Sequence, residues 1–134
     1  MVVLIFFICS KQLMALEDSC LNLENQGDLN ACACKDFTKA DAELNKIYQA
    51  ILQEYKDSPI AIKRIKKAEL SWIRFREDHM ESLFPKDSLD MGSSTAMCTC
   101  SEYTKLIKQR IAQLKEILNP QPDMCEPRMT FEKE

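Results

Sequence analysis

The feature that most constrains this chain is a helical spacing of apolar side chains in three long segments. Apolar side chains lie three or four positions apart within residues 28–57, 59–84 and 95–118, a spacing that places the apolar side chains of each segment on one face of an α-helix. The three stripes are Leu29, Ala33, Phe37, Ala40, Leu44, Ile47, Ile51 and Tyr55, then Ile62, Ile65, Ala68, Trp72, Phe75, His79 or Met80, and Leu83, then Tyr103, Ile107, Ile111, Leu114 and Leu118. With only 2 glycines in 134 residues, the chain favours long helices over a turn-rich β fold, and we predict an all-α domain.

Two breaks separate these segments. Ser58 can cap the second helix and Pro59 can take its first position, so the first connection is very short. Such a short connection makes the first two helices antiparallel neighbours. The second connection, 85–94, is a longer polar loop. We therefore predict a disulfide-stapled three-helix bundle, up-down-up, whose long first helix starts near Asp28 and spans roughly 45 Å.

The tight turn also fixes which residues lie level with each other in neighbouring helices. Counting from it places Asp41 at the level of Arg76, with Trp72 one helical turn before that arginine. We expect a partly buried ion pair between Asp41 and Arg76, with the guanidinium packed near the indole, and we assign it a structural role. The same counting puts Cys34 and Cys100 in one layer, so that both cysteine-rich stretches lie at the same end of the bundle.

The first fifteen residues, 1–15, are predicted to be a signal peptide. Residues 2–9 form an unbroken apolar run, too short to cross a bilayer but suited to the central part of an export signal. Cleavage after Ala15 is acceptable because that side chain is small, although the usual basic n-region is missing. A buried N-terminal strand is the alternative, and a lipid-attachment site at Cys9 is disfavoured by the bulky Ile8 before it. We expect a periplasmic or secreted protein with no membrane span in its mature form.

Cleavage at that position removes one of the 7 cysteines and leaves an even number, which in an exported chain is typical of disulfides. The remaining cysteines, all candidates for pairing, are Cys20, Cys32, Cys34, Cys98, Cys100 and Cys125. Zinc is disfavoured because the two side chains of a helical Cys-x-Cys point about 200° apart and do not converge on one ion. Cys34 with Cys100, or Cys32 with Cys98, would join the first helix to the third, and Cys20 can reach Cys32. The partner of Cys125 stays open.

The sequence contains no pattern that indicates catalysis or a bound cofactor. His79 is the only histidine, and the chain lacks a His-Glu-x-x-His metal motif and a glycine-rich phosphate loop. The formal net charge of −3 argues against a nucleic-acid partner, which would need a basic surface. We therefore predict a protein that is not an enzyme and has no catalytic residue, metal or cofactor.

Three stretches of the sequence contain recognisable motifs. They read LNACACKDFTKADAELNKIY at 29–48, AELSWIRFREDHMESLFP at 68–85 and GSSTAMCTCSEYTKLIKQRIAQL at 92–114. The positions that carry these motifs are Cys32, Ala33, Asp36, Phe37, Ala40, Asp41, Glu43, Leu44, Asn45, Tyr48, Trp72, Ile73, Phe75, Arg76, Gly92, Ser93, Arg110 and Leu114. In this order and spacing they resemble the family of the lysozyme inhibitor LprI. Glu77 and Met80 depart from that family, in which an Asp and often a Cys stand at these positions, so a disulfide between the second and third helices that many relatives would make cannot form here.

The resemblance implies a small exported helical domain, here residues 16–125, followed by a flexible tail at 126–134. It assigns a shared structural motif to Asp41, Trp72, Arg76 and Arg110. The first function that the resemblance implies is that the protein binds and blocks the lysozyme of a host or competitor. The negative net charge is compatible with this function, since an acidic protein meets a basic lysozyme at a higher rate. The alternative is an envelope interaction or adaptor module without lysozyme activity. The candidate partner-binding residues are those of the polar loop, Lys86, Ser88, Ser93 and Ser94.

Overall fold

Three helices make up most of the chain that the structure describes. The structure, a computed structural model, describes residues 20, 22–87 and 92–120. The helices are α1 (Gln26–Glu54), α2 (Pro59–Leu83) and α3 (Thr95–Leu118). With no strand in the described part, the predicted all-α class is confirmed, and α1 is the longest helix at 29 residues. The predicted signal peptide and tail, together with Ser88 and Cys125, lie outside the described residues.

The helix ends follow from the capping side chains. The Asn25 side chain accepts hydrogen bonds from the backbone N–H groups of Gly27 at 2.7 Å and Asp28 at 3.4 Å, so α1 begins earlier than the predicted start at Asp28. Asp28 lies in the first turn instead, where its negative charge interacts favourably with the positive end of the helix dipole. Ser58 caps α2, and Pro59 occupies its first turn, as the sequence predicts.

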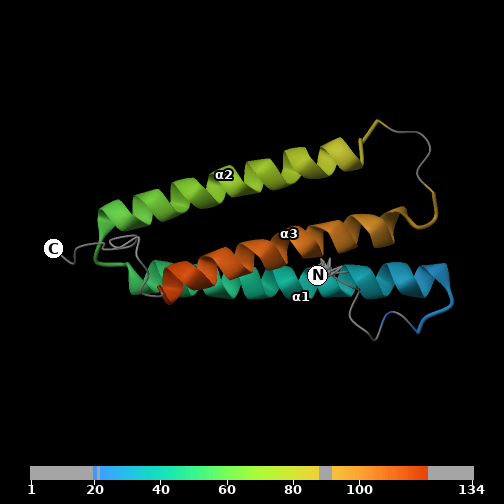
Figure 1. The fold of residues 1–134 in the computed structure, drawn as a ribbon, viewed down its shortest axis with the longest axis horizontal. Coiled ribbons are helices and arrows are strands. Elements are labelled where there is room, and N and C mark those ends of the chain that lie inside the picture. Colours follow the sequence, from blue (N-terminus) through green and yellow to red (C-terminus); the bar gives the residue numbers. More distant parts are fainter. Residues whose placement is uncertain (1–19, 21, 88–91, 121–134) are drawn as a thin grey trace, which may run out of the picture.

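The three helices form the predicted up-down-up bundle, but they are not equally spaced. Contacts between Cys34 and Cys100 and between Phe37 and Tyr103 advance in the same direction along both helices, so α1 and α3 are parallel. The Glu69–Arg110 and His79–Glu102 contacts run in opposite directions, so α2 is antiparallel to α3. Figure 1 shows α1 and α3 packed along most of their length, with α2 set apart from both.

The apolar core lies toward the turn that joins α1 to α2. Its buried members are Ala40, Leu44, Ile47, Ile51, Ala61, Ile65, Ile107, Ile111 and Leu114. Ile51 and Ile107 are fully buried, and each such side chain stabilises the fold by about 1.5–3 kcal/mol relative to leaving it in water. Within the described residues, none of the helices combines the length and the apolar character that a membrane span requires.

The inward face of α2 differs from the apolar stripe predicted for it. Ala68, Phe75 and Leu83 are exposed, and Phe75 has 56% of its surface in contact with solvent. The residues that α2 turns inward are Ala61, Ile65, Glu69, Trp72, Arg76 and Met80. These residues also follow a helical spacing, but two of them are charged. A prediction from apolar residues alone therefore chooses a neighbouring face of the helix as the buried one.

Candidate partner-binding site

A disulfide and an asparagine hold the start of α3 against the start of α1. Cys34 is bonded to Cys100, which confirms one of the two predicted links between the first and third helices. The Asn30 side chain donates to the backbone carbonyl of Ser93 at 2.9 Å and accepts from the backbone N–H of Met97 at 3.1 Å. The end of the second loop, at Ser93, and the first turn of α3, at Met97, are therefore both fixed to α1.

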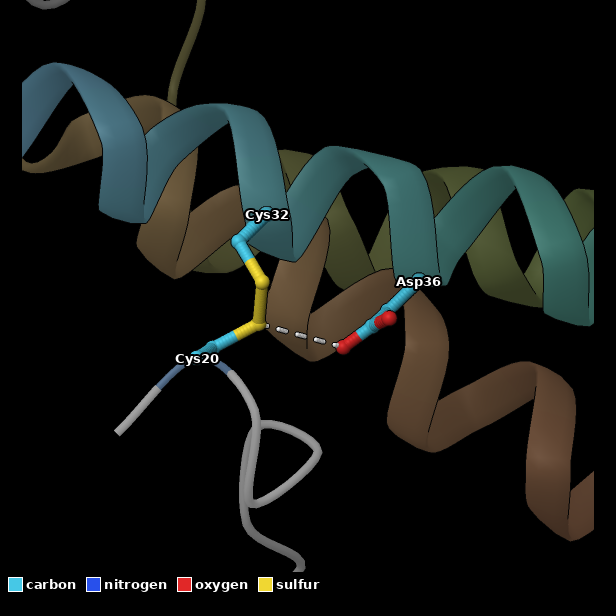
Figure 2. A group of neighbouring side chains, drawn as sticks. All are labelled: Cys20, Cys32 and Asp36. Carbon is cyan, nitrogen blue, oxygen red and sulfur yellow. Dashed lines mark hydrogen bonds between the residues drawn. A yellow bond between two sulfur atoms is a disulfide. The ribbon is translucent and has the colours of Figure 1, made fainter. Parts of the chain in front are cut away.

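A second disulfide joins the segment before α1 to that helix. Cys20 is fully buried and bonded to Cys32, beside the carboxylate of Asp36 (Figure 2). Cys20 Sγ lies 3.6 Å from Asp36 Oδ2. Cys20, Cys32 and Asp36 have the side-chain types of a metal site, but the disulfide leaves neither sulfur as the thiolate that a metal would bind.

Cys98 differs from the expectation that all the cysteines of the mature chain pair. It is an exposed free thiol, and Cys32 is bonded to Cys20 instead. The geometry of the helix explains this difference, since Cys98 precedes Cys100 by two residues and points about 200° away from it around α3. The inward sulfur of that stretch meets α1, and the outward one meets solvent.

The space between α2 and the other two helices is filled by an interhelical cluster of charged and aromatic side chains. We define the Trp72 cluster as Asp41, Glu69, Trp72, Arg76, Glu77, Tyr103 and Arg110. The Trp72 ring has the guanidinium of Arg76 at 5.2 Å from its centroid and that of Arg110 at 5.7 Å, which are cation–π distances. One tryptophan on α2 therefore contacts both the arginine of its own helix and the arginine of α3.

The strongest polar contact of the cluster is between Arg110 and Glu69. Arg110 donates from Nη2 at 2.7 Å and from Nε at 3.0 Å to the same oxygen of Glu69. Their side chains are only 12% and 9% exposed, so the pair is largely removed from water. A charge-assisted pair of this kind fixes the rotation of α2 about its own axis, because the carboxylate loses its partner when α2 turns.

Arg76 binds its neighbour Glu77 more closely than the partner expected from the register. Its Nη2 lies 2.9 Å from Glu77 Oε1, whereas its Nη1 lies 3.9 Å from Asp41 Oδ1. The Tyr103 hydroxyl donates to the other oxygen of Glu77 at 3.1 Å, and its ring lies 5.6 Å from the Arg76 guanidinium. The sequence analysis missed Glu69 and Glu77. The spacing of Glu69, Trp72 and Arg76 on one helical line is the signal that indicates Glu69, while no such spacing indicates Glu77.

The pKa values of two tyrosines, Tyr103 of this cluster and Tyr48, are raised. Burial raises the pKa of Tyr103, and its hydrogen bond to Glu77 and the charge of that carboxylate raise it further, against an opposing effect of Arg76. Burial also raises the pKa of Tyr48, together with the charge of Glu69. Tyr103 therefore keeps its proton as a donor to Glu77.

The loop residues proposed from the sequence lie at the end of the bundle that carries the Cys34–Cys100 disulfide. Lys86 and Ser93 are exposed, and Ser94 is half-buried at the start of α3. In the described part neither serine hydroxyl forms a hydrogen bond, and Ser94 caps α3 without a side-chain contact. The turn is closed instead by Thr95, whose hydroxyl donates to the carbonyl of Gly92 at 2.7 Å. The loop side chains are thus not used to hold the turn.

The surroundings of this loop are predominantly acidic. Exposed carboxylates lie on the last turns of α2 and directly after it, at Glu77, Asp78, Glu81 and Asp87. Glu102 on α3 faces His79 at 3.7 Å and Lys105 at 3.4 Å. This end of the molecule therefore combines the exposed side chains of Lys86 and Ser93 with an excess of nearby carboxylates, an arrangement that attracts a basic partner.

Comparison with known proteins gives the chain its relatives. The family model described as lysozyme inhibitor LprI matches residues 17–114, which include α1, α2, most of α3, both disulfides and the Trp72 cluster. An uncharacterized protein of Rhizobium meliloti (strain 1021) is 31% identical over 113 residues, covering 76% of this chain and 80% of that protein. No solved structure matches the chain significantly. The protein therefore belongs to the family of the lysozyme inhibitor LprI.

Proposed function

We propose that this protein is exported and inhibits lysozyme by binding to it, without catalysing a reaction of its own. The observation that carries the proposal is the family match over residues 17–114, which contains the whole loop between α2 and α3. The two disulfides support export to the periplasm or beyond, because disulfides persist in oxidising compartments. The apolar run at the N-terminus supports the same route, as an export signal.

The loop end of the bundle is the proposed contact surface. A basic lysozyme is drawn toward the carboxylates at the end of α2, which raises the rate of encounter. Glycoside hydrolases of this type act through a pair of carboxyl groups in a cleft. Lys86 offers an exposed ammonium group to such a cleft, and Ser93 and Ser94 offer hydroxyls that form no hydrogen bond within the described chain. Ser88 is part of the same proposal from its position in the sequence.

The Cys34–Cys100 disulfide supports this assignment through pre-organisation. It joins α1 to α3 close behind the loop, and Asn30 holds the carbonyl of Ser93. Because residues 92–94 are held next to α1 before binding, they lose less conformational entropy when the complex forms, and more of their contact energy appears as affinity.

The test is inhibition of lysozyme turnover by the purified protein, with cell-wall peptidoglycan as substrate. A triple variant, Lys86→Ala with Ser93→Ala and Ser94→Ala, removes the proposed contacts without breaking any hydrogen bond of the fold, and we expect inhibition to weaken at least tenfold. A matched control at the opposite end of the bundle, Gln49→Ala with Gln53→Ala and Lys56→Ala, leaves inhibition unchanged.

Two outcomes contradict the proposal. If the unaltered protein leaves turnover unchanged at large molar excess, inhibition is wrong and the adaptor alternative gains. If the loop variant and the control variant inhibit equally well, the protein inhibits lysozyme through another surface, and the assignment of the loop is wrong.

A further inference from the structure

The N-terminal half of α2 concentrates basic side chains on a chain whose net charge is negative. Between Pro59 and Arg74 the one carboxylate is Glu69, and it is turned inward onto Arg110. The basic side chains of this stretch, all of them exposed, are Lys63, Arg64, Lys66, Lys67 and Arg74. None of them pairs with a carboxylate anywhere in residues 20, 22–87 and 92–120. The fold therefore leaves this charge unneutralised.

These cations share one exposed line with apolar side chains. We define the outer stripe as Ile60, Lys63, Lys67, Leu70 and Arg74, which follow each other at steps of three and four. It lies on the side of α2 opposite the buried Ala61 and Ile65. Ile60 and Leu70 are 57% and 58% exposed, so apolar surface lies beside the cations on this line. The outer stripe runs for roughly 21 Å along the helix.

We propose that the outer stripe docks this protein on the surface of an anionic phospholipid membrane. Lysine and arginine side chains extend their charged ends to lipid phosphates while their stems and the adjacent Ile60 and Leu70 contact the headgroup region. Basic side chains near an anionic membrane surface each add about 1 kcal/mol of attraction, and apolar side chains beside them add contact with the headgroup region. The proposal goes beyond lysozyme inhibition and does not depend on it.

The shape of α2 favours a membrane over an acidic protein as the partner. The outer stripe is an exposed ridge on a single helix, and Figure 1 shows that this helix stands apart from α1 and α3. A stable protein interface covers about 800 Å² on each partner, which this ridge supplies only to a partner with a matching groove. A lipid surface accepts a ridge without such a match, because headgroups rearrange around it.

The charge along α2 also sets the orientation of the docked protein. The stripe ends where Glu77, Asp78 and Glu81 begin, and these carboxylates are repelled by anionic lipid. The half of α2 next to the α1–α2 turn therefore lies on the membrane, while the loop between α2 and α3 points away from it. The proposed lysozyme-binding loop stays accessible in this orientation.

The test is co-sedimentation of the full chain with two kinds of vesicle. We expect binding to vesicles of phosphatidylglycerol and phosphatidylcholine, weaker binding as salt rises, and little binding to phosphatidylcholine alone. The variant Lys63→Gln with Lys67→Gln and Arg74→Gln lowers affinity for the anionic vesicles about 100-fold, at about fivefold for each cation removed. Any apolar segment at the N-terminus binds both kinds of vesicle, so the ratio between them isolates the contribution of charge.

A matched variant separates the outer stripe from net charge. Lys35→Gln with Lys46→Gln and Lys108→Gln removes the same charge from exposed side chains that also form no ion pair in the described structure, and we expect less than a threefold loss. An equal loss in both variants overturns the proposal. Binding to soluble polyglutamate without binding to anionic vesicles also overturns it, in favour of an acidic protein partner. The stripe variant is expected to inhibit lysozyme as well as the unaltered protein, so failure of one proposal leaves the other standing.

Discussion

α1 meets α3 through apolar side chains and a disulfide, whereas α2 meets that pair through charged and aromatic side chains over much of its length. Ile107 and Leu114 of α3 are completely or almost completely buried, and Cys34 is bonded to Cys100. On α2 only Ala61 and Ile65 join the main apolar core. Beyond them, Arg76 and Glu69 occupy positions that hydrophobic side chains take in most bundles.

The difference shows that the contacts that stabilise this fold most are not the contacts that set the orientation of α2. Apolar contact between α1 and α3 supplies stability but specifies rotation weakly, since many apolar arrangements fill the same volume. The pair formed by Glu69 and Arg110 supplies direction, because a buried charge without its partner is costly. We expect substitutions at the α1–α3 interface to reduce stability most, and substitutions between α2 and the other two helices to change the position of α2.

The largest effect is expected from opening the link between α1 and α3. Replacing both cysteines, Cys34→Ser with Cys100→Ser, releases a loop of 66 residues and should lower the free energy of unfolding by about 4 kcal/mol. Urea denaturation without reductant measures this change. The matched variant Cys20→Ser with Cys32→Ser opens a loop of 12 residues, for which about 3 kcal/mol is expected. A smaller effect at Cys34–Cys100 than at Cys20–Cys32 would contradict the comparison.

The next effect is expected at the buried pair between α2 and α3. Arg110→Met leaves the Glu69 carboxylate buried without its partner, which should cost about 3 kcal/mol in urea denaturation. Adding Glu69→Leu to that variant removes the unpaired charge and should restore most of the loss. If the double variant is no more stable than the single one, the cost comes from packing around Trp72 and the pair has no orienting role.

A much smaller effect is expected at Asp41. Its side chain is 42% exposed and its closest atom lies 3.9 Å from Arg76, so solvent screens the pair. Asp41→Asn also keeps an oxygen that accepts from Asn45, and we expect a loss of no more than about 0.5 kcal/mol. A loss above about 1 kcal/mol would show that Asp41 holds α2 more strongly than its distance to Arg76 indicates.

The smallest effect concerns alkaline pH. Because the pKa of Tyr103 is raised in the folded state, the unfolded chain loses that proton first, and stability falls as pH rises from about 10. Below that pH the contribution is fully present. Tyr103→Phe should make the decline shallower, whereas Tyr55→Phe, at a tyrosine whose pKa is also raised by burial, serves as the comparison away from Glu77. Equal slopes above pH 10 for the Tyr103→Phe variant and the unaltered protein would contradict this account.

The sequence predicts the α1–α3 half of the fold better than the α2 half, for a physical reason. Ala33, Ala40, Leu44, Ile47 and Ile51 follow the predicted stripe of α1 and are buried, because α3 offers them an apolar surface. The predicted stripe of α2 fails at Phe75 and Leu83, since the space beside this helix is filled by arginine, glutamate and tryptophan. The spacing of apolar residues cannot identify a buried face whose side chains are charged and are buried because they pair with side chains of another helix.

The same reasoning separates what was predictable at the candidate site from what was not. Counting across the tight turn and then across the second loop placed Cys34 level with Cys100, because helix rise is constant. It also placed Arg76 near Asp41 but not beside Glu77, since that choice depends on rotamers and on the hydroxyl of Tyr103. The loop was selected from its residue types, whereas the proposal that its partner is lysozyme rests on the family match.

The Cys34–Cys100 bond closes a covalent ring that contains the rest of α1, all of α2 and the loop that follows. A protease that cuts once anywhere inside this ring opens it without dividing the molecule, because the two pieces stay joined through sulfur. A nicked protein therefore keeps its mass in a gel run without reductant and separates into fragments only after reduction. Under the proposed export, this topology means that a single cut between α1 and α2 or between α2 and α3 does not release either piece from the molecule.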